Sequence, residues 1–233
     1  MNPSISLIIP VLNEAQSIGL VLASLPAGMF DQVLVVDNGS TDRTSSVAAA
    51  HGATVVSEPA GGYGRACLAG VARLSPSCRT VVFMDGDASD DPTDVVHLVE
   101  PISLGQADLV IGARRGPRVQ AGALLPHQRW GNRLATWLIR TLYRAPCTDL
   151  GPFRAVDKEA LLSLNMHEPT FGWTVEMQAK ALRRGLRVVE VPVAYRPRIG
   201  TSKISGNFKN SLIAGATILW KIVRLRLTRP DAA

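Results

Sequence analysis

The chain has 233 residues, of which 46% are hydrophobic and 19% charged, a composition that excludes an intrinsically disordered protein. The net charge of +6 conceals two halves of opposite sign. Residues 1–111 carry 4 Lys and Arg against 12 Asp and Glu, and residues 112–233 carry 21 against 7. Such polarity favours a partner that presents both a cation and anionic groups, or a membrane surface. It does not favour nucleic acid, because aromatic residues are only 5% of the chain and no recognition motif is present.

The cysteines and the N-terminal residues of the sequence predict where in the cell the protein is located. Cys67, Cys78 and Cys147 form no CxxC pair and cannot all pair with one another, which is typical of a reducing compartment. No basic segment precedes the first apolar run, and Asn13 and Glu14 interrupt it, so we expect no signal peptide. No window reaches the roughly 18 apolar residues of a membrane-spanning helix. We therefore expect a cytoplasmic protein, soluble or peripheral on the cytoplasmic face of a membrane.

Short apolar runs alternate with amphipathic segments through the first half of the chain. Five runs predict buried strands: residues 6–10, 32–37, 54–57, 80–84 and 108–112. Helices are expected over residues 15–25, with Asn13 as the cap, and from Asp42 to His51, ended by Gly52. This alternation predicts an α/β fold with a mostly parallel sheet that is buried on both faces. Ligands of such sheets bind beyond the carboxyl ends of the strands.

The second half is less regular. We expect two helices, a strand, a basic loop and a last helix over residues 127–143, 174–184, 186–191, 195–206 and 207–227. No linker is evident, so we expect one domain over residues 1–206 and a basic C-terminal helix over 207–233. An apolar helix with a basic end can lie in a membrane interface. The alternative is that it packs on the domain or on a second copy of the chain, as a homodimer.

Two carboxylates surround a glycine directly after the fourth apolar run, in Asp85-Gly86-Asp87. Such a pair can hold Mg²⁺ or Mn²⁺ with positions left open for the phosphates of a nucleotide. The alternative is a solvated turn ahead of a helix that Asp91 caps and Pro92 begins.

Other polar residues follow the same strand ends. Asp37 can accept a hydrogen bond from a base or ribose, or it can only form the turn that follows it. Glu14 can face a ligand. Gly64 lies in a glycine-rich segment suited to a close backbone contact, but this segment does not follow the first strand, which argues against an NAD-linked oxidoreductase. Arg114 or Arg115, after the fifth run, can reach a phosphate.

Taken in order, the segments Pro10-x-x-Asn-Glu14, Val-Val-Asp37-x-Gly-Ser-Thr-Asp42, Gly61-x-x-Gly64-x-Ala66 and Met-Asp85-Gly-Asp87 resemble the inverting family 2 glycosyltransferases. The resemblance implies the Rossmann-like GT-A fold. It also implies a site for a nucleoside-diphosphate sugar, in which the residues at the positions of Pro10, Glu14 and Asp37 hold the nucleotide and Asp85 and Asp87 hold the sugar nucleotide. We expect the neighbouring Asn13, Gly64 and Gly86, together with Arg114, to belong to the same site. In that family the DxD aspartates also hold a divalent metal, and the residue at the position of Asp87 is its usual ligand.

The second half is similar to the dolichol- and polyprenyl-phosphate sugar synthases, in the segments 148–154, 172–176 and 196–203. In these enzymes an Arg…Gly-x-Ser-Lys loop closes over phosphates, which implies phosphate-binding roles for Arg198, Ser202 and Lys203. A solvated basic loop is the alternative. Two residues after the second aspartate of the DxD, where many synthases have a glutamine, this chain has Ser89. The sequence therefore does not identify a third metal ligand.

The expected reaction is a single displacement with inversion at the anomeric carbon. A polyprenyl-phosphate acceptor is already ionised and needs no strong base. A hydroxyl acceptor does need one, and Asp149 or Glu176 is then the candidate. Glu176 can instead form an ion pair with Lys180 one helical turn away. A protein that binds the nucleotide sugar without turnover is a further alternative.

Overall fold

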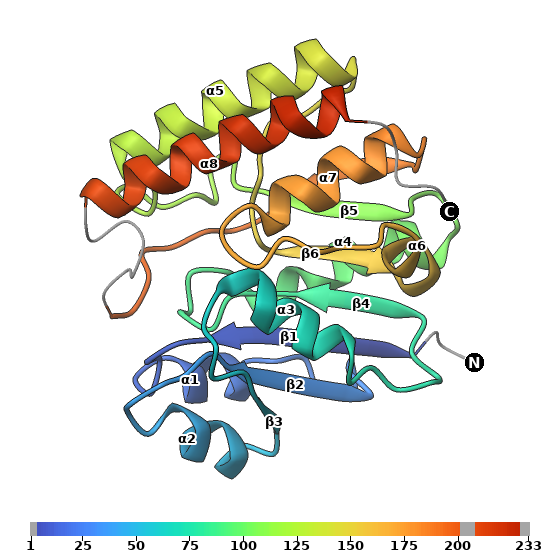
Figure 1. Cartoon of the computed structure of the whole chain (residues 1–233). Coiled ribbons are helices and arrows are strands. Elements are labelled where there is room, and N and C mark those ends of the chain that lie inside the picture. Colours follow the sequence, from blue (N-terminus) through green and yellow to red (C-terminus); the bar gives the residue numbers. More distant parts are fainter. Residues whose placement is uncertain (1–3, 201–207, 229–233) are drawn as a thin grey trace.

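The computed structural model describes residues 4–200 and 208–228, and a seven-stranded sheet forms its centre (Figure 1). The strands are β1 (Ile5–Val11), β2 (Gln32–Asp37), β3 (Thr54–Ser57), β4 (Thr80–Phe83), β5 (Leu109–Ala113), β6 (Arg154–Asp157) and β7 (Val188–Pro192). Their order is β3-β2-β1-β4-β6-β5-β7, and all pairs are parallel except those that involve β6. This is the mostly parallel α/β sheet predicted from the apolar runs.

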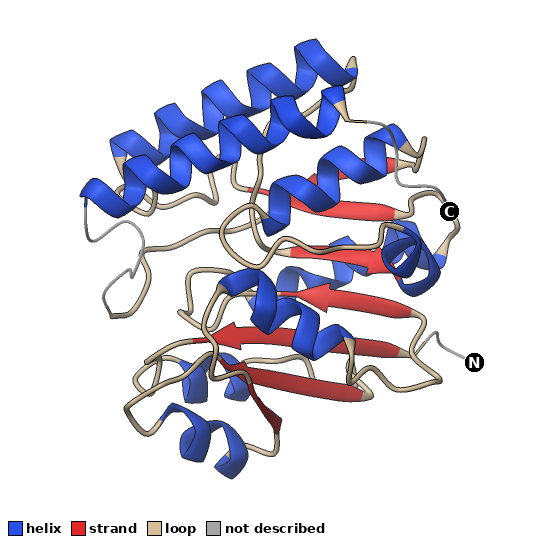
Figure 2. Ribbon diagram, in the orientation of Figure 1, coloured by secondary structure: helices blue, strands red, loops and turns tan. Residues whose placement is uncertain are grey.

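Helices cover both faces of the sheet (Figure 2). They are α1 (Ile18–Ala23), α2 (Thr44–Ala50), α3 (Tyr63–Val71), α4 (Val95–Ser103), which follows a short 3₁₀ turn at Pro92–Asp94, α5 (Pro126–Tyr143), α6 (Lys158–Ser163), α7 (Trp173–Arg183) and α8 (Phe208–Leu227). Apolar residues of α1, α2 and α4 pack on one face of the sheet, and those of α3, α6 and α7 pack on the other. Because β1, β4 and β5 are buried along their whole length, they read as the continuous apolar runs of the sequence.

Strand β6 was not predicted, and it is the strand that runs antiparallel to its neighbours. Its sequence Arg-Ala-Val-Asp is short and begins with Arg154, so no apolar run marks it. Arg154 is fully buried, and its guanidinium donates to the carbonyls of Gly151 and Thr174 at 3.2 and 2.9 Å. Since β5 and β6 are antiparallel neighbours, β5 ends where β6 begins, and the segment that connects them lies at that end of the strands.

The C-terminal helix α8 lies alongside α5 and packs on α5 and α7 (Figure 1). Ile222 of α8 is fully buried in a cluster with Ile139 of α5 and Val175 of α7. The observed packing on the domain corresponds to one of the two alternatives for this helix. Within the described residues, no helix is long and apolar enough to cross a membrane.

Of the two residues predicted to cap helices, one does so and the other does not. Asp91 caps the turn that begins with Pro92, by accepting from the backbone N–H of Thr93 at 3.1 Å, as predicted. The prediction that Asn13 caps the first helix was wrong. Asn13 adopts a φ of 54°, and its side-chain oxygen accepts from the N–H of Thr41 at 2.8 Å, so it ties two loops together.

Candidate active site

Asp85 and Asp87 follow β4 at the edge where β1 and β2 also end. The hydroxyl of Tyr63 donates to Oδ1 of Asp85 at 3.2 Å. Burial, and then the charge of Asp87, raise the pKa of Asp85 to about 7. Oδ1 of Asp87 accepts from the N–H and the hydroxyl of Ser89 at 2.9 and 2.5 Å. Ser89, which stands where many synthases have glutamine, therefore orients Asp87.

The basic loop after β7 reaches these aspartates. The guanidinium of Arg198 donates to the Glu14 carboxylate, and its Nη1 lies 3.3 Å from Oδ2 of Asp87. The N–H of Ile199 donates to the carbonyl of Asp87 at 2.9 Å. The structure thus brings together Glu14, Asp87 and Arg198, which are far apart in sequence. Ser202 and Lys203 lie outside the described residues.

A third carboxylate, which the sequence did not single out, lies beside this pair. Asp90 is 2% exposed, and neither of its carboxylate oxygens has a hydrogen-bond partner among the described residues. Burial, and then the charges of Asp85 and Asp87, raise its pKa well above the usual value. Buried carboxylates this close together fit a bound cation, which would favour their ionised forms. Within the described chain no group of three acidic, His or Cys ligands converges, so Asp85 and Asp87 would hold a metal with oxygens of the ligand or water.

The other residues predicted to bind the donor have mostly structural contacts. Asp37 accepts from the N–H of Ser40 at 2.8 Å and from the hydroxyl of Ser45. Burial alone would raise the pKa of Asp37, but these bonds outweigh it and lower the pKa. Pro10 is buried within β1, in register with Val36 of β2.

Gly64 and Gly86 are required for close packing. A Cβ on Gly64 would lie 1.8 Å from the carbonyl oxygen of Glu168, and one on Gly86 would lie 2.5 Å from Cγ1 of Val11. Neither distance is sterically allowed, so packing within the protein accounts for both glycines. The loop 168–169 is thereby held against the start of α3.

Arg114 and Asp149 form a bidentate ion pair beyond β5. Nε and Nη2 of Arg114 lie 2.8 and 2.7 Å from the two oxygens of Asp149, and the N–H of Leu150 donates to the same carboxylate at 2.7 Å. Burial opposes ionisation of Asp149, but Arg114 outweighs it and lowers the pKa. The guanidinium also lies 5.1 Å from the ring centre of Tyr195. Asp149 therefore positions Arg114.

A cavity of about 560 Å³ extends from the two aspartates to the space between α5 and α8. Its polar end is lined by Tyr63, Asp85, Asp87, Arg114 and Arg198. The rest, here called the apolar trough, is lined mainly by hydrophobic residues of the 122–152 segment, of residue 171 and of α8: Leu124, Leu125, Ala135, Leu150, Phe171, Ile218 and Leu219. No sequence pattern marks the trough, because its walls come from segments that meet only in the folded chain.

Glu176 does not lie near the aspartates. It lines a separate cavity, in which its carboxylate accepts from the N–H groups of His167 and Glu168 at 3.1 and 2.7 Å. Its Oε1 lies 3.2 Å from Nζ of Lys180, so the predicted i, i+4 ion pair is present. Trp173, 1% exposed, belongs to the core.

Comparisons with known proteins agree with this geometry. The family described as Glycosyl transferase family 2 matches residues 6–164. An uncharacterised glycosyltransferase of Mycobacterium tuberculosis is 42% identical over 94% of this chain and 98% of its own length. The undecaprenyl-phosphate mannosyltransferase of Micrococcus luteus is 32% identical over 94% and 97%, respectively. Glucosyl-3-phosphoglycerate synthase of M. tuberculosis, crystallised with Mn²⁺, UDP and glucosyl-3-phosphoglycerate, superposes with a TM-score of 0.78 at 28% identity over 99% of this chain and 82% of that one. The chain is thus a glycosyltransferase with a GT-A-like fold, and it belongs to glycosyl transferase family 2.

Proposed function

We propose that this protein is a metal-dependent inverting glycosyltransferase that transfers a sugar from a nucleoside-diphosphate sugar to a polyprenyl phosphate. The observation that carries this proposal is the apolar trough, which begins at Asp85 and Asp87 and continues between α5 and α8. A soluble acceptor needs no long hydrophobic wall beside the reacting centre, whereas an isoprenoid chain does. The mannosyltransferase of M. luteus, by its name, acts on such an acceptor.

The donor would bind at the polar end of the cavity. Asp85 and Asp87 would hold Mg²⁺ or Mn²⁺, which supplies positive charge to the diphosphate when bound. We propose that Arg198 and, in the adjoining loop, Lys203 add positive charge beside the leaving diphosphate, and that the hydroxyl of Ser202 donates a hydrogen bond to it.

The acceptor phosphate would lie where the trough meets the polar end. Arg114 lines this part of the cavity, and Asp149 fixes the direction of its guanidinium. An acceptor phosphate is already ionised, so positioning and charge compensation suffice for attack on the anomeric carbon. The absence of a base is consistent with the geometry, since Asp149 is bound to Arg114 and Glu176 lies in another cavity.

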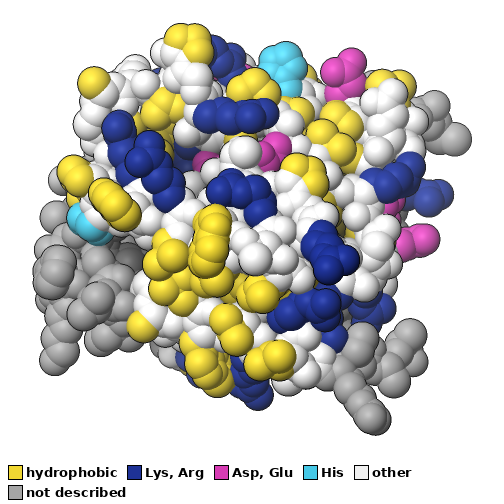
Figure 3. Space-filling model, turned by 90° about the horizontal axis from the view of Figure 1, so that it is seen from above, with side chains coloured by type: hydrophobic (Ala, Val, Ile, Leu, Met, Phe, Trp, Pro, Cys, Tyr) yellow, Lys and Arg dark blue, Asp and Glu magenta, His cyan; other side chains and the backbone are white. Residues whose placement is uncertain are grey.

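The face formed by α5 and α8 suits a membrane surface. Figure 3 shows hydrophobic side chains gathered on this face, with Lys and Arg side chains beside them. Three of the four tryptophans are exposed here: Trp130, Trp137 and Trp220. Neither helix contains an acidic residue, whereas α5 carries three arginines and α8 carries two lysines and two arginines. Tryptophan and basic residues together are typical of interfacial helices. We propose that this face contacts the cytoplasmic side of a membrane, next to the trough.

A second candidate is transfer to a hydroxyl of a small phosphorylated acceptor. It is favoured by the superposition on a synthase crystallised with a phosphoglycerate product. This reaction would need a base, for which Asp149 and Glu176 stay the candidates from the sequence.

The test is an assay of nucleoside diphosphate released from a panel of nucleotide sugars with Mn²⁺. Each donor is incubated with polyprenyl phosphate, with phosphoglycerate, or alone, and D87A serves as the inactive control. We expect release that depends on polyprenyl phosphate and on metal, and a loss on the order of 10²-fold or more in D87A. Release with phosphoglycerate alone would favour the second candidate, and full activity in EDTA would contradict the metal site.

A further inference from the structure

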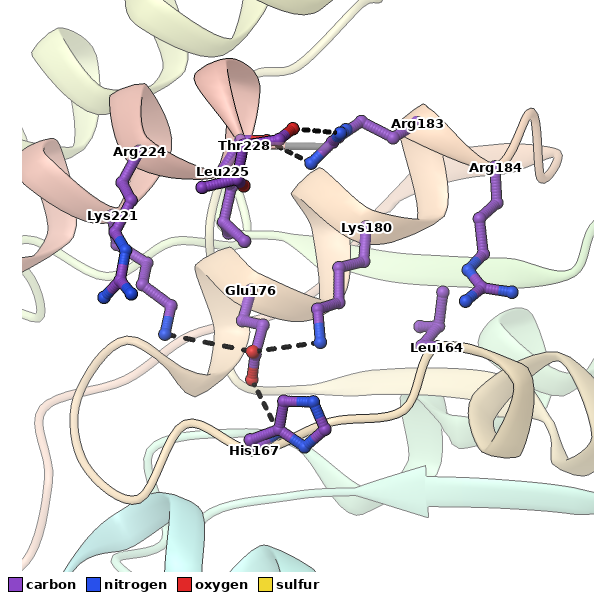
Figure 4. Close-up of a pocket in the computed structure, with 10 residues that line it drawn as sticks. All are labelled: Leu164, His167, Glu176, Lys180, Arg183, Arg184, Lys221, Arg224, Leu225 and Thr228. Atoms are coloured by element: carbon purple, nitrogen blue, oxygen red, sulfur yellow. Dashed lines mark hydrogen bonds and ion pairs between the residues drawn. The ribbon is translucent and has the colours of Figure 1, made fainter. Parts of the chain in front are cut away.

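A second cavity, of about 320 Å³, lies between α7 and α8 and shares no lining residue with the first (Figure 4). Its walls come from both helices and from the segment that follows α6. The lining residues are Leu164, His167, Glu176, Lys180, Arg183, Arg184, Lys221, Arg224, Leu225 and Thr228. Half of these are lysines or arginines and one is acidic, so the cavity is strongly positive. The proposed transfer uses none of them.

Two lysines are held in place within this cavity. In Figure 4 the side chains of Lys180 and Lys221 approach Glu176 from opposite sides. Their Nζ atoms lie 3.2 and 3.8 Å from Oε1 of Glu176, and Lys221 also lies 2.6 Å from Oε2 of Glu168. A buried carboxylate that is fixed by backbone N–H groups therefore orders two ammonium groups at the cavity wall.

Among the described residues, no carboxylate forms an ion pair with the arginines of this cavity. Arg183 donates to the carbonyls of Leu225 and Thr228, which ties α7 to α8. Among the described residues, neither Arg184 nor Arg224 has an acidic partner within ion-pair distance. Clustering unbalanced cations is unfavourable unless an anion binds between them, and guanidinium groups match the oxygens of a phosphate.

The cavity borders the exposed apolar face of α8. The α8 residues that line it have the i, i+3, i+4, i+7 spacing of one helix side: Lys221, Arg224, Leu225 and Thr228. The adjacent side presents Trp220, Val223 and Leu227, which are 57, 39 and 80% exposed. The guanidinium of Arg224 lies 4.8 Å from the ring centre of Trp220, where the two sides meet. A ligand with a phosphate next to hydrocarbon chains would match both sides at once.

We propose that the cavity between α7 and α8 is a second binding site, which takes the phosphate group of an anionic ligand. The neighbouring apolar side favours a phospholipid headgroup as the source, and soluble phosphate offers the same chemistry. The proposal does not depend on the transfer to polyprenyl phosphate, because that transfer uses none of the residues that line this cavity.

The test measures binding without nucleotide sugar or metal. Wild type, the cavity variant R184Q/R224Q and the control R73Q/R79Q are titrated calorimetrically with inorganic phosphate and with short-chain phosphatidic acid below its critical micelle concentration. Arg73 and Arg79 are exposed and lie outside both cavities, so the control removes the same charge elsewhere. We expect saturable binding to wild type and control, weakened on the order of tenfold in R184Q/R224Q.

Each outcome has a defined meaning. Equal affinity for the two probes would support the site and identify free phosphate as sufficient, whereas tighter binding of phosphatidic acid would support the site and a lipid source. Equal binding by the two double variants, or no saturable binding by wild type, would overturn the proposal. Circular dichroism and thermal unfolding of the variants show whether a loss comes from misfolding.

Discussion

Nη1 of Arg198 lies 3.3 Å from Oδ2 of Asp87, so this arginine pairs with a carboxylate that we propose as a metal ligand. Metal and arginine then compete for Asp87, and R198Q should bind Mn²⁺ several-fold more tightly in the absence of nucleotide. The same variant should lose transfer activity on the order of 10²-fold, because the leaving diphosphate loses a cation. Calorimetry and the transfer assay measure the two effects. Arg196, which pairs with Asp91 at 2.6 Å, gives the control R196Q, in which Mn²⁺ affinity should not rise. A weaker Mn²⁺ affinity in R198Q would show that Arg198 supports the metal site.

Asp85 should make the metal-free protein sensitive to pH. Its pKa is raised from 3.8 to about 7, so the folded protein binds more protons than the unfolded chain between these values. Stability therefore falls as the pH rises from about 4 to about 7. In D85N this loss disappears, and the gain in Tm over wild type should grow between pH 5 and pH 8. Thermal unfolding in EDTA checks this, with the exposed-site variant E100Q as the control. A gap in Tm that does not change with pH would contradict the assignment.

Filling the apolar trough should discriminate between acceptors by length. Gly131 of α5 lines the trough, and a Cβ at this position would meet no atom within 4 Å. G131L should raise the KM for a long-chain polyprenyl phosphate by about tenfold, as expected when a bulky group blocks a hydrophobic pocket. A short prenyl phosphate and the donor should be affected much less. G131A is the matched control, because both substitutions favour the helix. If G131L affects long and short acceptors equally, the chain does not lie in the trough.

Replacing Glu176 should affect stability more than chemistry. E176Q removes the charge that Lys180 and Lys221 surround, and we expect the free energy of unfolding to fall by about 1–3 kcal/mol. The transfer rate of the folded variant should stay within a few-fold of wild type. Urea unfolding and the transfer assay separate the two quantities. A large loss of rate with unchanged stability would instead indicate a base, and thus a hydroxyl acceptor.

Exposed tryptophans should govern membrane contact. Trp130 and Trp137 are 73 and 52% exposed on α5, so W130A/W137A should leave the Tm nearly unchanged. Its fraction bound to anionic vesicles should fall several-fold in a flotation assay. L162A, which removes an exposed leucine from α6, is the control. Equal binding by both variants would exclude this face as the contact.

The sequence predicted the half of the fold in which local pattern and burial agree. Strands β1, β4 and β5 are buried along their whole length and β2 along its centre, so each appears as an apolar run. The polar residues after β1, β2 and β4 were expected to lie together at the carboxyl ends of these strands. Strand β6 was missed for two reasons. It pairs with β4 and β5, which are distant in sequence, and it begins with the charged Arg154, so no apolar run marks it. Asn13 was misassigned, since the partner that it binds, Thr41, is distant in sequence.

For the candidate site, the sequence identified several of the residues but not the contacts that they make. Asp85, Asp87, Glu14 and Arg198 were singled out, and the structure brings all four together. Glu176 could not be placed, because a carboxylate on a helix has the same sequence pattern whether it faces a substrate or a pair of lysines. Neither the trough nor the second cavity could be predicted from the sequence, since each is lined by segments that meet only in the folded chain.

The reversed strand β6 also bears on how such an enzyme can change its substrate. Because β5 and β6 are antiparallel neighbours, the connection between them, which contains α5, begins and ends at the same end of the two strands. It does not have to cross the sheet, so its length is not fixed by the sheet. Insertions or deletions in this connection would leave every strand register intact. The wall of the proposed acceptor trough can therefore change in length and sequence while the half of the chain proposed to bind the nucleotide is retained. This capacity to evolve follows from the direction of one strand.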